Sequence, residues 1–174
     1  QQSFAIESHN RAVSATTANN FSSSIIPIET ESGIVSEDGC IRGNTNQETL
    51  NKLRPAFLTD GSVTAGTSSP LTDGAAFVFV CSESFAKENG LTPLARIKSI
   101  AVSGCSPEIM GIGPVEASRK ALERAGLSLE EIDIVELNEA FAAQSLAVIE
   151  EMGLNPSIVN IDGGALALGH PLGA

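Results

Sequence analysis

The chain has 174 residues, of which 42% are hydrophobic and 18% charged, which is typical of a globular protein and excludes a disordered or fibrous one. Ten Lys and Arg stand against 21 Asp and Glu, so the formal net charge is -11 and a nucleic-acid backbone is excluded as a partner. Only 4% of the residues are aromatic, so we expect an aliphatic core, and no apolar run approaches the roughly 18 residues of a membrane span.

The first 71 residues are rich in Ser, Thr and Asn and are predicted to form a loop-rich accessory region. Apolar spacing predicts a helix over residues 3–18, and residues 25–28 (IIPI) indicate a short strand that its proline confines to a sheet edge. Thr45 and Glu48 have the spacing of a capping box, which predicts a short helix that ends before Pro55.

Strands and helices are predicted to alternate beyond Thr72. Residues 75–81 (AAFVFVC) form a continuous apolar run, which indicates a strand buried on both faces. The other predicted strands cover residues 94–102, 132–137 and 158–161. The predicted helices cover residues 84–89, 114–125 and 138–152. This alternation predicts an α/β layered domain.

Three cysteines, Cys40, Cys81 and Cys105, lie far apart, and with two histidines they form no zinc-binding pattern. We therefore expect no metal site and reduced thiols in a cytoplasmic protein, with an organelle as the alternative location. The start of the chain lacks an initiator Met and a secretion signal. The chain ends where a further helix would begin, so we expect an excerpt of a longer protein.

Two polar side chains, Asn138 and His170, follow apolar segments at positions where an α/β sheet would end. Ligands bind at that edge of open α/β sheets, so both residues are candidates for a functional site. The alternative for Asn138 is a helix N-cap, and the alternative for His170 is a packed loop histidine. Several glycines near His170 favour the functional hypothesis, because they allow a ligand to approach the backbone closely: Gly163, Gly164, Gly169 and Gly173.

Five segments of the chain together resemble the thiolase family, whose members make or cleave 3-ketoacyl-CoA. Two carry most of the resemblance, NEAFAAQ (138–144) and GGALALGHPLGA (163–174). The others are SHNRA (8–12), LRPAF with GSVTAGTSSPLTDGAA (53–76), and EIMGIGPVEASRKALERAG (108–126). Their order and spacing agree with the family over the whole chain, which a lone short motif would not achieve.

The resemblance implies a layered αβαβα fold, incomplete in this chain, made of two similar halves with an inserted loop domain that holds coenzyme A. Residues 1–71 would be the later part of the loop domain, 72–90 the end of the N-terminal half, and 91–174 a truncated C-terminal half. The family's nucleophilic cysteine would lie upstream of Gln1 and its acid/base cysteine downstream of Ala174. The chain alone is then expected to be inactive, and the complete protein to be a homodimer or homotetramer.

For catalysis, the resemblance implies that a cysteine is acylated by acyl-CoA and that the acyl group passes to a second acyl-CoA, or to CoA in the reverse reaction. His170 would help to activate the nucleophile, and with a water held by Asn138 it would stabilise the enolate oxygen of the thioester. Glu139 is an alternative base, although a carboxylate in the first turn of a helix is the simpler explanation.

Coenzyme A is implied as a substrate, and no covalently bound cofactor is expected. Arg42 would lie near the nucleotide phosphates or adenine, Phe57 and Ala65 against the adenine and pantetheine, and Ser69 would bond to the pantetheine arm. Met110 and Phe141 would line the acyl end. By residue type alone, Arg42 could instead be a surface charge and the apolar side chains ordinary core.

Two other functions stay open at this point. The first is a non-catalytic module that binds coenzyme A, and the second is one chain of a split thiolase whose partner supplies the cysteines.

Overall fold

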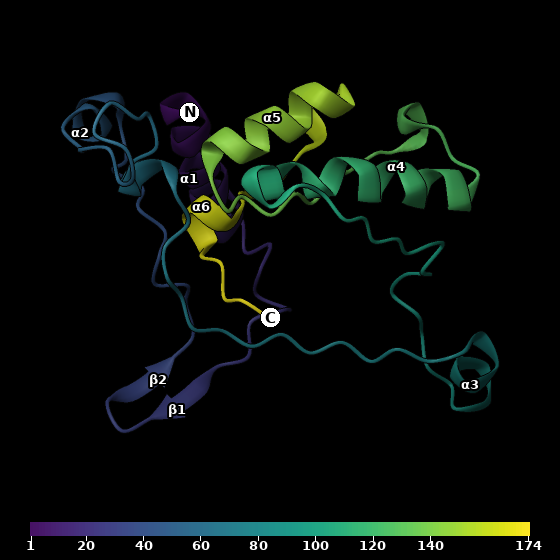
Figure 1. Cartoon of the computed structure of the whole chain (residues 1–174). Helices are drawn as coiled ribbons and strands as arrows, with labels where there is room; N and C mark the ends of the chain where they lie inside the picture. Colours follow the sequence, from purple (N-terminus) through teal and green to yellow (C-terminus); the bar gives the residue numbers. More distant parts are fainter.

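A computed structural model describes all residues, 1–174, and gathers most of its helices in one cluster (Figure 1). That cluster contains α1 (Gln2–Thr17), α2 (Gln47–Asn51), α4 (Gly113–Ala125), α5 (Ala142–Met152) and α6 (Ala165–Leu168). Four short 3-10 helices are η1 (Ala65–Thr67), η2 (Pro107–Ile112), η3 (Leu129–Glu131) and η4 (Pro156–Ile158). Helix α3 (Glu83–Glu88) lies apart from the cluster, between two extended segments.

Helix α1 packs inside the cluster through a stripe of small side chains. Ala5, Ser8, Ala12 and Ala15 are buried, and their spacing places them on one face of the helix. Small residues allow close approach: a Cβ added to Gly163 would lie 2.7 Å from the Ala12 Cβ. The predicted helix over residues 3–18 is confirmed, and its buried face lies against α6.

The core is aliphatic, as the composition predicts. One buried cluster joins α4, α5 and the segments that follow them: Val115, Leu137, Val148, Ile149, Leu154 and Val159. A second, smaller cluster joins α1, α2, α5 and α6: Ala5, Leu50, Ala142 and Leu166. Burying each larger aliphatic side chain stabilises the fold by about 1.5–3 kcal/mol, so these clusters position the loops between the helices.

The local signals for helix ends are mostly confirmed. Helix α3 begins after Ser82, whose hydroxyl accepts from the Phe85 N–H, and the next glycine, Gly90, has φ +63°. Helix α4 ends at Gly126 in the left-handed conformation, with φ +66°. The capping residue of α2 differs from the prediction: Asn46, not Thr45, caps the helix and forms the capping box with Thr49.

The predicted strand over residues 25–28 is wrong in its bounds. The structure forms a hairpin of β1 (Ile28–Thr30) and β2 (Gly33–Val35), paired antiparallel with Ile28 opposite Val35. Pro27 has no N–H to donate, so the pairing starts only after it. The hairpin projects from the helical cluster and all six of its residues are exposed.

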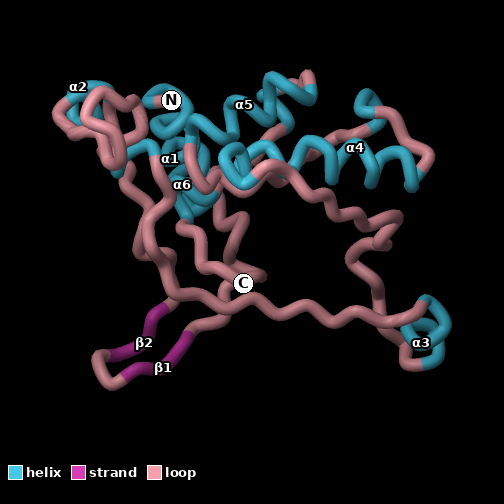
Figure 2. The backbone as a smooth tube through the Cα atoms, viewed as in Figure 1, coloured by secondary structure: helices cyan, strands magenta, loops and turns pink.

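The predicted strands over residues 75–81 and 94–102 do not form in this structure. Both segments are extended but have no hydrogen-bonded partner strand, and Figure 2 shows this part of the chain as loop on either side of α3. Phe77 and Leu94 are 87% and 102% exposed, so the expectation of a doubly buried strand is wrong for the chain on its own. An apolar run becomes a strand only when neighbouring strands supply hydrogen bonds and cover its faces.

The predicted strands over residues 132–137 and 158–161 pair only at one point, a parallel bridge between Val135 and Val159. Backbone hydrogen bonds on either side of the bridge measure 2.9 Å, from Val135 N to Ile158 O and from Asn160 N to Val135 O. This short pairing positions the loop that begins at Asn138. None of the helices combines the length and apolar content of a membrane span.

Candidate functional site

Asn138 and His170, the two residues predicted at the end of apolar segments, lie in contact. The side-chain amide nitrogen of Asn138 is 3.1 Å from both Nδ1 and Nε2 of His170. A neutral imidazole has one accepting ring nitrogen, so the amide donates to whichever nitrogen carries no proton. The alternative role of Asn138 as a helix cap is wrong, because α5 begins at Ala142 with Phe141 as its N-cap.

The backbone before His170 is held in place by Thr72. The His170 N–H donates to Thr72 Oγ1 at 3.3 Å, and Thr72 in turn donates to the carbonyl of Pro70 at 2.8 Å. Gly169 has φ +102°, and a Cβ there would lie 2.5 Å from Thr72 Oγ1. The turn therefore requires glycine for both its conformation and its close approach, and it fixes where the imidazole can lie.

Glu139, next to Asn138, is nearly completely buried, with 2% of its surface exposed. Its carboxylate accepts hydrogen bonds from Ser8 Oγ at 2.6 Å, Asn160 Nδ2 at 2.9 Å and the Leu166 N–H at 3.1 Å. The prediction that Glu139 occupies the first turn of a helix is wrong, because α5 starts three residues later.

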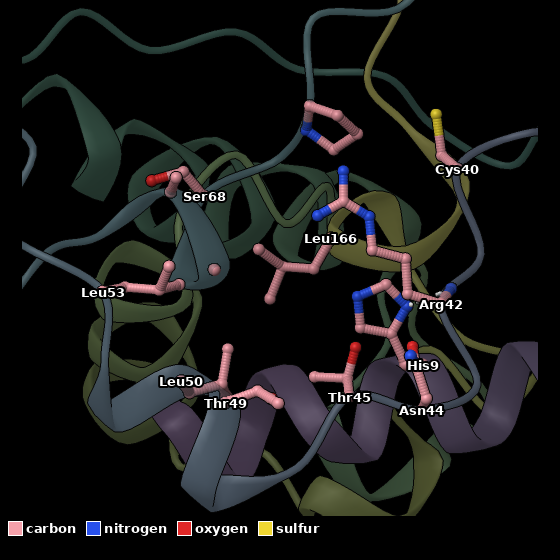
Figure 3. Close-up of a pocket in the computed structure, with 13 residues that line it drawn as sticks. His9, Cys40, Arg42, Asn44, Thr45, Thr49, Leu50, Leu53, Ser68 and Leu166 are labelled. Carbon is pink, nitrogen blue, oxygen red and sulfur yellow. Dashed lines mark hydrogen bonds between the residues drawn. The ribbon is translucent and has the colours of Figure 1, made fainter.

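A cavity of about 350 Å³ lies between α1, α2, η1 and α6 (Figure 3). Arg42 and Ala65, both predicted to bind coenzyme A, line it. Its other lining residues are His9, Cys40, Asn44, Thr45, Thr49, Leu50, Leu53, Gly66, Ser68, Pro70 and Leu166. A guanidinium beside an apolar wall suits a ligand that joins a phosphate to a hydrophobic arm.

His9 is a site residue that the sequence did not single out. It is 7% exposed, and its Nδ1 accepts from the Arg42 backbone N–H at 3.1 Å. Burial, with a smaller contribution from the Arg42 charge, lowers the pKa of His9 below its ordinary value. With Nδ1 accepting, the neutral ring carries its proton on Nε2. The only available signal was position, because His9 follows Ser8 on the buried side of α1.

Phe57, Phe141 and Ser69 lie near one another, whereas Met110 lies in η2. The rings of Phe57 and Phe141 meet edge to face with centroids 6.0 Å apart, and Phe57 is 72% exposed, so it is not core. Ser69 donates from N–H and Oγ to the Ala140 carbonyl at 3.0 and 3.1 Å, and Ser68 lines the cavity in its place. Met110 is 75% exposed, and no hydrogen bond joins it to the other predicted site residues.

The cavity and the Asn138–His170 pair are linked through Thr72. Cys40 lines the cavity with its Sγ 3.9 Å from Thr72 Oγ1, which also accepts from the His170 backbone. Leu166, at the base of the cavity, belongs to α6, which leads directly to His170. The cavity lining and the backbone of His170 are therefore joined through a single residue, Thr72.

Comparison with known proteins agrees with this arrangement. Family models described as "Thiolase, N-terminal domain" and "Thiolase, C-terminal domain" match residues 1–84 and 91–174. An acetyl-CoA acetyltransferase of Paracoccus denitrificans is 51% identical, over 100% of this chain and 46% of that protein. A 3-ketoacyl-CoA thiolase of Photobacterium profundum is 55% identical, over 99% of this chain and 47% of that protein.

Solved structures agree over the same length. Human mitochondrial 3-ketoacyl-CoA thiolase in complex with CoA matches with a TM-score of 0.97 and 48% identity, covering 99% of this chain and 44% of that one. The chain spans about half the length of the curated relatives it matches, and it contains part of the layered thiolase fold. With both family models matched in order and about half of all residues identical to the relatives, the chain belongs to the thiolase family.

Proposed function

We propose that the complete protein is an acyl-CoA C-acyltransferase, which forms or cleaves 3-ketoacyl-CoA, and that this chain supplies Asn138 and His170 to its active site. The observation that carries the proposal is the 3.1 Å contact between the Asn138 amide and the His170 ring, beside the cavity that Arg42 lines. The names of the relatives, acetyl-CoA acetyltransferase and 3-ketoacyl-CoA thiolase, support the same reaction class.

In the proposed reaction, a nucleophilic cysteine gives its proton to a base and its thiolate attacks the acyl-CoA carbonyl. The bond to the CoA sulfur breaks, and this sulfur takes up the proton, so CoA leaves as its thiol. The second acyl-CoA then gives an α-proton to the thiolate of an acid/base cysteine and attacks the acyl carbon, which releases the nucleophilic cysteine as its thiolate. Both cysteines of this scheme would lie beyond residues 1–174. Neither role is proposed for Cys40, Cys81 or Cys105, because none of them stands in a cysteine motif of the family and no hydrogen bond joins any of them to the His170 ring.

Asn138 and His170 would stabilise the negative charge that develops on the thioester oxygen. Their polar groups are fixed before the charge forms, which is the condition under which such donors are effective. The contact with Asn138 orients the imidazole, and the Thr72 hydrogen bond holds the backbone behind it. Removing one donor of this kind typically lowers the rate by about 10²- to 10³-fold.

Coenzyme A would be bound as a substrate in the cavity, with no covalently attached cofactor. Arg42 would pair with a phosphate, Ala65 would contact the pantetheine arm, and the exposed edge of Phe57 would face the adenine. Ser69 would accept from the arm, since its hydroxyl hydrogen already serves the Ala140 carbonyl. Phe141 and Met110 would line the acyl end. For Phe141, its position three residues after Asn138 supports this role.

The same proposal includes the division of the chain and its assembly. Residues 1–71 would belong to the coenzyme A-binding loop domain, 72–90 to the N-terminal half and 91–174 to the C-terminal half. The change of matching family model between residues 84 and 91 supports the second boundary. A homodimer or homotetramer is proposed for the complete protein, and a matching yeast peroxisomal thiolase described as dimeric supports it.

The test is coenzyme A binding and turnover by the complete protein with Arg42→Ala. We expect weaker binding of coenzyme A, with a loss that shrinks as salt rises, because screening already weakens the wild-type contact. Arg124→Ala is the matched control, since Arg124 lies on α4, donates to the Ile100 carbonyl and does not line the cavity. Unchanged affinity at low salt would remove Arg42 from the site.

Turnover separates the proposed enzyme from the other two candidates. Coenzyme A binding without acyl transfer by the complete protein would favour a binding module. Transfer that appears only after a second polypeptide is added would favour a split thiolase.

A further inference from the structure

We propose that Glu139 is the positioning residue of the candidate site, and that its buried carboxylate sets the Asn138 amide and the His170 imidazole at their contact distance. The expected effect on kcat rests on the proposed function. The positioning itself does not depend on that function, because one carboxylate holds together the segments that carry Asn138 and His170.

Three donors from three parts of the chain meet at this carboxylate. Oε2 accepts from Ser8 Oγ at 2.6 Å, on α1, and from the Leu166 N–H at 3.1 Å, in the first turn of α6. Oε1 accepts from Asn160 Nδ2 at 2.9 Å, just after the parallel bridge at Val159. Hydrogen bonds to an ionised acceptor are roughly twice as strong as neutral ones, so three such bonds at one carboxylate hold these segments firmly together.

The junction reaches both reacting residues through short stretches of backbone. Asn138 is the residue directly before Glu139. A movement of the Glu139 side chain that shifts its backbone therefore also rotates the peptide unit that joins Glu139 to Asn138. His170 lies two residues after the end of α6, whose first turn is bonded to the same carboxylate. A shift of Glu139 would therefore move the two partners of the 3.1 Å contact relative to each other.

The site is shaped around the carboxylate. A Cβ on Gly164 would overlap the carboxyl group of Glu139, so glycine is required there. The Gly164 N–H donates to Ser8 Oγ at 3.1 Å, which directs the Ser8 hydroxyl hydrogen toward Glu139. Ser8, Glu139 and Asn160 are each at most 3% exposed, so water cannot replace these partners.

The chemistry of the donors requires an acceptor with no hydrogen of its own. Asn160 cannot turn its amide round, because its Oδ1 accepts from Leu137 N and its Nδ2 donates to Leu137 O, both at 2.7 Å. Its remaining N–H must therefore point at Glu139. A glutamine at 139 would direct its own NH₂ group either at this amide or at the Leu166 N–H, and one pair of donors would face each other.

Glu139 is not itself placed to act on substrate. Its two oxygens are occupied by the three donors, and it is 2% exposed, whereas the neighbouring Asn138 side chain is open to solvent. A general base must reach the proton it removes directly or through one water. Glu139 therefore acts through Asn138 and His170.

The test compares Glu139→Gln with Val148→Ala in the complete protein. Val148 is a buried core residue of α5 at 1% exposure, so its truncation lowers stability while it leaves all the hydrogen-bonding groups of the junction intact. Per folded molecule, we expect Glu139→Gln to lower kcat by about 10- to 100-fold with the KM for coenzyme A within about twofold, as for a misplacement near 1 Å. Val148→Ala should leave both constants unchanged.

A second readout does not depend on activity. In protein with isotope-labelled histidine, the ring nitrogen signals of His170 should shift in Glu139→Gln and stay in place in Val148→Ala. If Glu139→Gln fails to fold, Ser8→Ala, which removes one of the three donors, should show the same changes at smaller size.

Unchanged His170 signals together with wild-type kcat would overturn the positioning role. A wild-type protein without acyl transfer whose His170 signals still shift in Glu139→Gln would instead contradict the proposed function and keep the positioning role. The two failures are therefore distinguishable.

Discussion

Residues 1–174 expressed alone are predicted to aggregate or to form a molten state, because the chain leaves two long apolar segments uncovered. Eight large side chains in these segments are at least 64% exposed: Phe77, Val78, Phe79, Val80, Leu94, Ile97, Ile100 and Val102. Burying a side chain of this size stabilises a fold by about 1.5–3 kcal/mol. For the eight exposed side chains together, the isolated chain therefore lacks about 12–24 kcal/mol of stabilising free energy. That is as large as the whole free energy of unfolding of a typical domain, about 5–15 kcal/mol.

The assay is size-exclusion chromatography of the isolated chain, dye binding to exposed apolar surface, and calorimetry. We expect large species, strong dye binding and no cooperative transition. The double variant Phe77→Ser with Phe79→Ser should reduce dye binding, while Glu88→Ser on exposed α3 serves as the control. A monomer that unfolds in one sharp transition and binds no dye would refute the reasoning, because it would show that the apolar segments are covered.

Three further predictions concern stability of the complete protein. Asn160→Ala removes three buried hydrogen bonds and should lower the free energy of unfolding by about 3 kcal/mol in urea titrations, and a loss below about 1 kcal/mol would contradict it. Because the pKa of His9 is lowered in the folded state, the unfolded chain binds more protons as the pH falls through 6.5, and stability falls with it. His9→Gln should flatten the dependence of Tm on pH in that range, and an unchanged slope would contradict the assignment. Burial, then the charges of Asp162 and Glu139, raises the pKa of Glu136, so stability falls as the pH rises above 4.5. Glu136→Gln should therefore raise Tm at neutral pH but not below about pH 4, and an equal effect at both would exclude titration as its cause.

Helices were predictable because their signals are local. The buried stripe of α1 and the left-handed glycine after α4 depend on residues within a few positions of each other. The error at the start of α2 was small, since Asn46 rather than its neighbour caps the helix, whereas α5 begins at Ala142, four residues later than expected. Either side chain can satisfy the free N–H groups of a first turn, and sequence alone does not rank them.

Strands were not predictable in the same way, because a strand needs partners that the local pattern does not specify. Residues 75–81 have the composition of a buried strand, yet they stay extended and unpaired. Residues 132–137 pair only at Val135, where Val159 lies opposite. Apolarity predicted the extended backbone correctly and the burial incorrectly.

The candidate site was predictable to the extent that it lies in motifs. Asn138 and His170 were expected at one edge of the sheet and lie in contact. His9 was not identified as a site residue, and Glu139 was considered only as an alternative base or a first-turn carboxylate, because their hydrogen-bond partners Arg42 and Ser8 lie 33 and 131 positions away in the sequence. Hydrogen bonds between residues so far apart in the sequence produce no local residue pattern from which they could be predicted.

The most direct test of the Asn138–His170 pair is turnover per folded molecule of the complete protein with His170→Ala, together with burst-phase acylation followed by mass. If His170 acts as a general base or oxyanion donor, turnover of the variant should be about 10²- to 10³-fold slower. Coenzyme A affinity and Tm should stay nearly unchanged, because the imidazole would contact the reacting carbonyl and not the nucleotide. If His170 is instead a packed loop histidine, the variant should lose about 1–3 kcal/mol of stability, seen as a lower Tm, and the protein that remains folded should turn over normally. Wild-type turnover and acylation in this variant would contradict the catalytic role of His170.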